Sequence, residues 1–394
     1  MQPSQRLFRL RHLHLPSLHP HYVPYSLASR VQEHLRRKQL AFKDAAASGS
    51  TTSLSPPPPA LISFTPAPVY TLGRRQTEPL DQAELARLTA PLEVATPLHF
   101  GPTPAPTAET IHLQPHVTPS PRGGLTTYHG PGQVVLWPVI DLKSVGTEAA
   151  AAAAARLSCC APPTGGGLTV RTYARLLETT TMSVLNRVFG LRSTTTEDPG
   201  VWVTRRRRER EREQEQGQGQ EEELAKVAAL GVHLRRHITA LGTAVNVAMP
   251  GSDGLGSDGE ETRNPWTRIV PCGLPGKEVT SVAWEFARRS EGLGGEGFRV
   301  GVGVVDEMLL QQVRPGRIAR TREQAVAEVW AEEFAGGIGL GNEVPDGGVE
   351  MVDTEEVLGL MEELTRLAEK TGDGQDGQVT PEEAEYLGRI RMLL

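Results

Sequence analysis

The stretch that decides the fold is Arg122–Gln133, which reads RGGLTTYHGPGQ and leads into the apolar run VVLWPVI at Val134–Ile140. Four of its twelve residues are glycines, which adopt positive φ angles and let the backbone approach a ligand closely. Arg122 supplies a fixed charge and His129 a tunable one. A polar, glycine-rich segment that enters a strand therefore predicts the wall of a pocket. The alternative is a glycine-rich hairpin with a hydrogen-bonded core histidine, which the Gly-Pro-Gly turn alone favours.

The composition is that of a globular protein. The chain has 394 residues, of which 38% are hydrophobic, so it is long and apolar enough to bury a core. A net charge of −6 and a pI near 6.0 disfavour a dedicated nucleic-acid-binding protein. The sequence contains no run of about eighteen uncharged apolar residues, so no membrane span is predicted. Cys159, Cys160 and Cys272 lack the spacing of a zinc site and cannot build a disulfide framework. We expect a reducing compartment and no bound metal.

Biased segments interrupt the chain and are expected to be surface insertions. They lie near residues 45–59, 101–121, 148–167, 205–223 and 251–261. Residues 1–12 have the composition of a mitochondrial presequence, although a basic N-terminal strand of the domain explains them nearly as well. This division leaves a structured domain at 13–345 and an acidic helical C-terminal extension at 346–394. For the extension, a solvated segment is favoured over a contact surface.

Strands and helices alternate between these insertions, which predicts a mixed α/β or α+β fold. The expected strands lie at 60–64, 69–72, 134–140, 200–204, 227–234 and 243–249. A helical period of inward apolar residues begins at Val170 and stops at Gly190, a typical C-terminal residue. Thr321 and Thr380 have the sequence context of residues that begin a helix.

Cys272 is the residue best placed to be a nucleophile. It lies outside the insertions, between Pro271 and Gly273. A nucleophilic cysteine needs a nearby cation or helix N-terminus that favours the thiolate. Lys226, at the head of the small apolar run KVAALGV, is a candidate for that cation. On position alone, a buried structural cysteine and a lysine at a surface strand end remain the commoner alternatives.

Taken together, these segments resemble the lipoyl(octanoyl) transferase family, in a fungal-type mitochondrial form with insertions. The resemblance spans about Leu13 to Phe334 and is carried by RGG and YHGPGQ, then KVAALG at 226–231, then PCG at 271–273, in that order. It implies an α/β (α+β) mixed-sheet domain related to the biotin and lipoate protein ligases, with the catalytic domain at 13–345. It also implies transfer of an octanoyl group from octanoyl-acyl carrier protein to a lysine of lipoyl domains, the first step of protein lipoylation, without a cofactor.

The resemblance further implies which residues form the site. Cys272 forms the acyl thioester, and Lys226 lowers the pKa of its thiol. The substrate-binding positions are Arg122, Gly123, Gly124, Leu125, Thr126, Thr127, Tyr128, His129, Ala229, Leu230, Gly231, Gly242, Thr243 and Ala244. Leu241 stands where the family usually has histidine, which puts any polar contact from that position in doubt.

Donor, acceptors and location follow from the same resemblance. The acceptors are lipoyl domains of 2-oxoacid dehydrogenase complexes and the glycine cleavage H protein, and the location is mitochondrial. Small residues along the wall would leave room for an eight-carbon chain, whose burial is worth about 0.8 kcal/mol per methylene. Two alternatives stay open: an ATP-dependent lipoate-protein ligase of the same fold, and an inactive acyl-binding scaffold.

Overall fold

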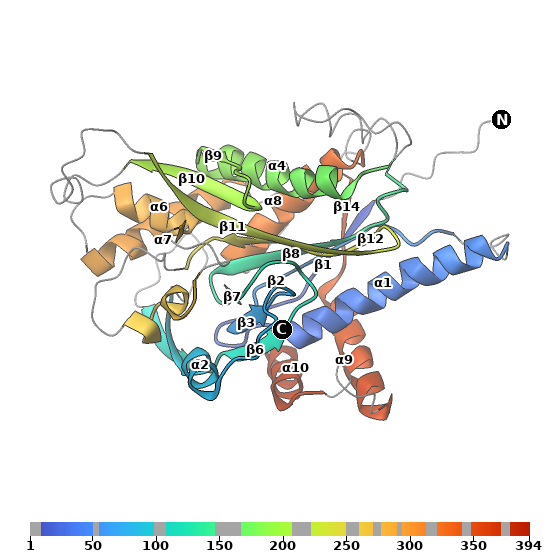
Figure 1. Cartoon of the computed structure of the whole chain (residues 1–394), viewed down its shortest axis with the longest axis horizontal. Coiled ribbons are helices and arrows are strands. Elements are labelled where there is room, and N and C mark those ends of the chain that lie inside the picture. The colour runs from blue at the N-terminus through green and yellow to red at the C-terminus, as the bar shows by residue number, and fades with distance from the viewer. Residues whose placement is uncertain are drawn as a thin grey trace.

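A mixed nine-stranded sheet runs through the centre of the protein, seen in a computed structural model (Figure 1). Its strands are β1 (Leu10–His14), β2 (Ala60–Phe64), β8 (Gln133–Val139), β9 (Ser193–Thr194), β10 (Gly200–Arg206), β11 (Glu222–Arg235), β12 (Ile238–Asn246), β13 (Glu278–Val279) and β14 (Val349–Met351). They are ordered β14, β1, β2, β8, β12, β11, β10, β9, with β13 beside β11. β1 is parallel to β14 and β2, β13 is parallel to β11, and the other pairs are antiparallel. The structure describes residues 9–49, 55–97, 108–145, 167–206, 222–249, 260–270, 277–289, 294–312, 321–340, 348–371 and 379–394.

Helices cover both faces of this sheet (Figure 1). One face carries α4 (Val170–Phe189), α6 (Val282–Arg289), α7 (Gly294–Leu310) and α8 (Arg322–Gly337), and the other carries α1 (Tyr25–Ala47), α9 (Thr354–Thr371) and α10 (Pro381–Leu393). Along β8, Val134 and Leu136 join the first core, whereas Val135 and Trp137 join the second. Successive side chains of a strand point to opposite faces, so a continuous apolar run suits a strand buried on both sides. The mixed α/β class is confirmed.

A smaller layer packs beside the main sheet. In it β3 (Val69–Leu72) lies between β6 (His116–Pro119) and β7 (Thr127–His129), and β4 (Leu92–Pro97) pairs with β5 (Ala108–Leu113). α2 (Gln82–Leu88) and two 3-10 turns, at residues 260–262 and 265–268, accompany these strands. The aromatic rings of Tyr70, Tyr128 and Trp266 form its buried centre, with centroid distances of 5.2 Å and 5.6 Å.

Helix ends follow the chemistry of their terminal residues. α4 ends at Gly190, whose φ of 60° and ψ of 18° lie in the left-handed region that glycine tolerates. Thr321 accepts a hydrogen bond from the Gln324 N–H at the start of α8, and Thr380 forms a complete capping box at the start of α10. These predicted ends are confirmed. Val170 is an exception to the predicted inward face, because it is the first residue of α4 and is 52% exposed.

Several predicted insertion limits are wrong. The segment 101–121 contains β5 and β6, α1 continues to Ala47, and the segment 205–223 takes in the end of β10 and the start of β11. Arg205 gives the physical reason at one of these limits. Its side chain is 2% exposed and forms ion pairs with Glu278 at 2.5 Å and Glu285 at 2.8 Å. The first residues of the charged run at 205–223 therefore belong to β10, which pairs with β11. Residues 148–166 and 251–259 lie outside the described residues.

The first and last strands meet at one edge of the sheet. Leu10 lies in register with Val349, so residues 10–12 belong to β1, and the presequence limit at residue 12 is wrong. α9 and α10 pack with α1 in the second core, where Arg30 donates two hydrogen bonds, of 2.9 Å and 3.0 Å, to the fully buried carboxylate of Glu383. The C-terminal extension is thus packed against the main domain. None of the described helices has the length and apolarity needed to cross a membrane.

Candidate functional site

Lys226 lies within β11 and not at a surface strand end. The residue is only 5% exposed. Its Nζ donates a hydrogen bond to the backbone oxygen of Pro199 at 3.1 Å and lies 4.6 Å from the ring centroid of Trp202. A lysine is rarely buried without such partners, and this distance permits a cation–π interaction. The fold therefore holds one amine in a defined position beside β10.

The two short glycine-containing segments of the predicted site lie side by side. In register across β11 and β12, the pairs are Ala229 with Ala244, Leu230 with Thr243, and Gly231 with Gly242. A Cβ on Gly242 would lie 2.2 Å from the Leu136 backbone oxygen, so this glycine lets β12 approach β8. The β11 segment begins three residues after Lys226, roughly 10 Å along the strand.

Arg122 brings the RGG segment onto this wall. The residue is 9% exposed, and its Nη2 donates hydrogen bonds to the backbone oxygen and Oγ1 of Thr71 at 2.6 Å and 2.9 Å. A Cβ on Gly231 would lie 3.0 Å from Arg122 Cδ, so the arginine stem fills the space beside that glycine. Sequence reasoning missed Thr71, because a threonine in a short strand carries no signal of its distant partner.

The Gly130-Pro131-Gly132 turn connects the two sheets. β7 pairs with β3, whereas β8 pairs with β2 and β12, so the hairpin of the alternative interpretation is wrong. Its hydrogen-bonded core histidine is confirmed, because His129 is 8% exposed and bonds to Gln133. Gly132 has a φ of 84°, and a Cβ there would lie 2.2 Å from the Ala248 backbone oxygen. The Gly132 carbonyl accepts hydrogen bonds from the N–H groups of Val247 and Ala248, at 2.9 Å and 2.8 Å. The turn is thereby fixed against the end of β12.

His129 begins a series of buried hydrogen bonds. Its Nδ1 donates to Gln133 Oε1 at 2.7 Å, since an amide oxygen only accepts. Gln133 Nε2 donates to Asn246 Oδ1 at 2.8 Å, and Asn246 Nδ2 donates to the Thr280 backbone oxygen at 2.8 Å. The Thr280 N–H donates to the Lys226 backbone oxygen at 2.9 Å. We call His129, Gln133, Asn246 and Thr280 the amide chain. It connects the opening stretch to the strand that carries Lys226.

The surroundings of His129 keep its imidazole neutral. The ring stacks on Tyr25 with a centroid distance of 5.8 Å and an interplanar angle of 18°. Burial lowers the pKa of His129 to about 4, with Arg122 acting in the same direction and the Gln133 hydrogen bond opposing both. The tunable charge expected of this residue is therefore absent near neutral pH. Tyr25 was not among the predicted site residues.

The remaining predicted residues of the stretch differ in exposure. Gly123 is exposed, Thr127 and Tyr128 are buried, and three are half-buried, namely Gly124, Leu125 and Thr126. Tyr128 packs in the aromatic centre of the small layer. Leu241 is 5% exposed, has a φ of 59°, and lies in the core on the α1 side of the sheet. Its side chain makes an apolar contact at the position where the resemblance expects histidine.

Cys272, with Pro271 and Gly273, lies outside the described residues. The described chain resumes at Lys277, and Val279 of β13 pairs in register with Lys226. Lys277 Nζ lies 6.0 Å from the centroid of the Trp202 ring that Lys226 also faces. Lys277 is five residues from Cys272, a span of at most about 18 Å. The structure thus brings the segment after Cys272 to Lys226, and the meeting of the two side chains stays a prediction.

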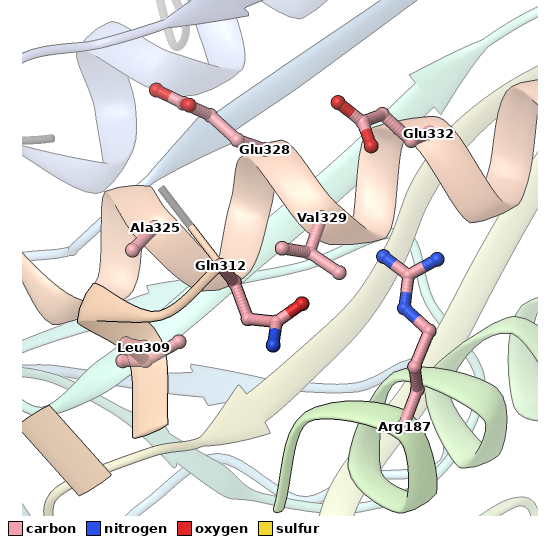
Figure 2. Close-up of a pocket in the computed structure, with 7 residues that line it drawn as sticks. All are labelled: Arg187, Leu309, Gln312, Ala325, Glu328, Val329 and Glu332. Carbon is pink, nitrogen blue, oxygen red and sulfur yellow. The ribbon is translucent and has the colours of Figure 1, made fainter. Parts of the chain in front are cut away.

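A separate pocket lies among the helices that cover the first face of the sheet (Figure 2). Its lining residues come from α4, α8, the end of α7 and the turn that follows α7, and are Arg187, Leu309, Gln312, Ala325, Glu328, Val329 and Glu332. None of them belongs to the predicted site. Across the described ranges, no group of three or more His, Cys, Asp or Glu side chains is arranged to hold a metal ion.

The family of the chain follows from a match over most of its length. Residues 37–291 match the lipoyl protein ligase A/B catalytic domain, a range that includes Arg122, Lys226 and Cys272. The chain therefore belongs to the lipoyl protein ligase A/B catalytic family.

Relatives of known name identify the branch of this family. A probable octanoyltransferase of Schizosaccharomyces pombe is 31% identical over 227 residues, which are 57% of this chain and 68% of that protein. The mitochondrial octanoyl-[acyl-carrier-protein]:protein N-octanoyltransferase of Homo sapiens is 30% identical over 293 residues, 73% of this chain and 86% of that one. Among solved structures, a lipoate-protein ligase A bound with ATP aligns with 84% of this chain and 99% of its own at 12% identity, with a TM-score of 0.36. The branch is that of the octanoyltransferases, which are acyltransferases.

Proposed function

We propose that the protein transfers an octanoyl group from octanoyl-acyl carrier protein to a lysine of lipoyl domains, through a thioester on Cys272, in the mitochondrion. The names of the relatives support the donor and the location. The observation that carries the mechanism is the position of Lys226: it is buried, and β13, which begins six residues after Cys272, pairs directly with it. A cation close to a cysteine favours the thiolate, which is the nucleophilic form.

The reaction divides into two acyl transfers. In the first, the Cys272 thiolate attacks the octanoyl carbonyl carbon, a new thioester forms, and the carrier thiolate leaves. In the second, the lysine amine of the lipoyl domain attacks that thioester, the amide forms, and the Cys272 thiolate leaves. The Lys226 ammonium can give its proton to the carrier thiolate that leaves in the first transfer, and the neutral Lys226 amine can then accept the proton that the attacking lysine loses in the second. The exchange of one thioester for another is close to thermoneutral, so the reaction needs no ATP.

We propose that the acyl chain of this substrate lies along the wall formed by β11 and β12, beside the small side chains of Ala229 and Ala244. The wall is backbone and small side chains, because Gly231, Gly242, Ala229 and Ala244 face one another across β11 and β12. Arg122 closes one side through its stem over Gly231. An octanoyl chain along this surface would gain about 0.8 kcal/mol for each methylene that it buries.

Intact mass spectrometry tests the thioester. Wild-type protein incubated with octanoyl carrier protein is expected to gain one octanoyl group that hydroxylamine removes, and Cys272→Ala is expected to gain none. Cys159→Ala, a matched substitution at another cysteine, should behave as wild type. Full adduct formation by Cys272→Ala would overturn the assignment of the nucleophile. Product from free octanoate only when ATP is present would instead select a ligase.

The acceptor is tested separately. Wild-type protein loaded with octanoate is mixed with a purified lipoyl domain, and the same domain with its target lysine changed to arginine serves as the control. Transfer to the lysine form alone is expected. Loss of the adduct to water, with no acylated domain, would contradict the proposed acceptor while leaving the thioester intact.

A further inference from the structure

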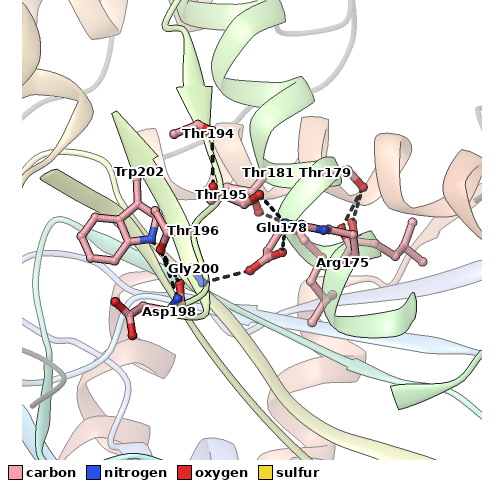
Figure 3. Close-up of polar contacts among 12 residues, drawn as sticks. Arg175, Glu178, Thr179, Thr181, Thr194, Thr195, Thr196, Asp198, Gly200 and Trp202 are labelled. Carbon is pink, nitrogen blue, oxygen red and sulfur yellow. Dashed lines mark hydrogen bonds and ion pairs between the residues drawn. The ribbon is translucent and has the colours of Figure 1, made fainter. Parts of the chain in front are cut away.

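The peptide group between Pro199 and Gly200 contacts two side chains of opposite charge. Its carbonyl oxygen accepts the hydrogen bond from Lys226 Nζ at 3.1 Å, and its N–H donates to Glu178 Oε1 at 3.1 Å. The carbonyl and N–H of one planar trans peptide point in opposite directions. Glu178 and Lys226 therefore bind opposite sides of a single peptide group. Figure 3 shows Glu178 on α4 reaching Gly200 at the start of β10.

Glu178 is itself held firmly. The residue is 6% exposed, and its second carboxylate oxygen accepts a hydrogen bond from Arg175 Nη1 at 2.9 Å. Arg175 also donates to Thr195 Oγ1 (Figure 3). Between these points, Trp202 Nε1 donates to the Asp198 backbone oxygen at 3.3 Å. α4 thus holds both ends of the turn at residues 195–200.

Lys226 lies directly against this turn. Gly200 has a φ of 131°, and a Cβ there would lie 2.6 Å from the Ala228 backbone oxygen and 3.3 Å from Lys226 Cε. No side chain fits between the turn and the lysine stem. A shift of the turn would therefore move the amine of Lys226 with it.

We propose that Glu178 is a positioning residue for Lys226, acting through the Pro199–Gly200 peptide. This inference rests on the proposed function, in which Lys226 assists Cys272. A hydrogen bond to a carboxylate is stronger than one between neutral groups, and it polarises the peptide so that the carbonyl becomes a better acceptor. The flexible lysine side chain is thereby held in one orientation. Glu178 touches neither substrate nor cysteine.

The variant Glu178→Gln tests the charge while keeping the shape. Glutamine retains an oxygen for the Gly200 N–H and loses the carboxylate. We expect kcat for octanoyl transfer to fall about tenfold, the size that follows from weakening one charge-assisted hydrogen bond, with KM for octanoyl carrier protein unchanged. Alkylation of Cys272, followed on its own peptide, should shift to higher pH, as it should in Lys226→Ala.

Glu333→Gln is the matched control. Glu333 of α8 also binds α4, through Ser183 at 3.0 Å and Arg187 at 2.5 Å, and both partners lie outside the 195–200 turn. Its kcat and alkylation profile should match those of the wild type. A tenfold fall in kcat for this variant would mean that any weakening of α4 slows transfer, and the inference would be overturned.

A double-mutant cycle separates positioning from a merely structural role. If Glu178 acts through Lys226, Glu178→Gln should cause no further loss of kcat in the Lys226→Ala background. An equal loss in both backgrounds would assign Glu178 to the fold alone and reject the inference. An unchanged kcat for Glu178→Gln beside a reduced one for Lys226→Ala would also reject it, with the proposed function intact. Full turnover by Lys226→Ala would instead refute the proposed role of Lys226, and the inference with it.

Discussion

Replacement of Gln133 by leucine should reveal how much the amide chain contributes to stability. Gln133 is 1% exposed and bonds on both sides, accepting from His129 Nδ1 and donating to Asn246 Oδ1. Leucine has a similar volume, so the main effect is two buried polar atoms that lose their partner. Each such atom costs about 1–3 kcal/mol. We therefore expect the free energy of unfolding to fall by roughly 2–6 kcal/mol, a large share of the 5–15 kcal/mol typical of a domain.

Urea unfolding followed by tryptophan fluorescence measures this change. Gln32→Leu is the matched control, because Gln32 is 5% exposed and its Nε2 is buried with no hydrogen-bond partner within the described part of the chain. That substitution should be neutral or stabilising. The reasoning is refuted if Gln133→Leu costs less than about 1 kcal/mol, the lower bound for one unsatisfied group. It is also refuted if both variants lose equally, since burial of any amide would then explain the result.

Three further predictions concern other parts of the fold. Gly242→Ala should destabilise the protein by at least roughly 2 kcal/mol in the same assay, because its Cβ would lie 2.2 Å from the Leu136 backbone oxygen. Gly359→Ala on α9, where a Cβ would have open space, should stabilise the protein by about 0.5–1 kcal/mol. A stabilising Gly242→Ala beside a destabilising Gly359→Ala would contradict the strand packing. The pKa of His129 is lowered from 6.5 to about 4, so the unfolded chain takes up a proton before the folded chain does as the pH falls. The free energy of unfolding should therefore decrease by roughly 3 kcal/mol between pH 6.5 and pH 4, because one unit of pKa is worth about 1.4 kcal/mol. His129→Gln should abolish this pH-dependent loss of stability and leave the similar loss caused by His14, whose pKa is also about 4. An unaltered pH profile of unfolding would contradict a neutral, buried His129. Glu383→Gln should lower the free energy of unfolding by about 3 kcal/mol, because it leaves the charge of Arg30 buried without its carboxylate. Glu356→Gln, in the exposed pair with Arg11, should lower it by less than about 1 kcal/mol. Similar losses for the two variants would show that the Arg30 pair is as weak as a surface pair.

Local patterns in the sequence predicted elements well, because they depend on neighbouring residues. The apolar run at Val134–Ile140 and the glycine stop at Gly190 needed no tertiary information, and both were confirmed. The order of the motifs also predicted the family. What local patterns leave open is which sheet a strand joins: the stretch that reads as one hairpin is divided between two sheets at Gly130-Pro131-Gly132.

Contacts between residues that are distant in sequence could not be predicted, because local patterns depend on neighbouring residues only. Lys226 reads as a surface lysine until Pro199 and Trp202 of β10 are placed beside it. Nothing in the sequence near Glu178 points to its partner, the Gly200 N–H, which lies 22 residues further along the chain. Arg205 reads as part of a solvated run until β13 and α6 bring two carboxylates to it. In each case the burial of a charge depends on a partner from another element.

The pairing of β1 with β14 sets the order in which this sheet can be completed. Leu10 and Val349 are 339 residues apart in sequence, so β1 emerges during synthesis long before its partner does. Until β14 and α9 arrive, the outer edge of β1 exposes unpaired N–H and C=O groups, which invite pairing with another chain. The nascent protein therefore keeps an open sheet edge while the residues between β1 and β14 are synthesised, and a chaperone that shields β1 during that interval should raise the yield of folded protein more than one that acts on the finished chain.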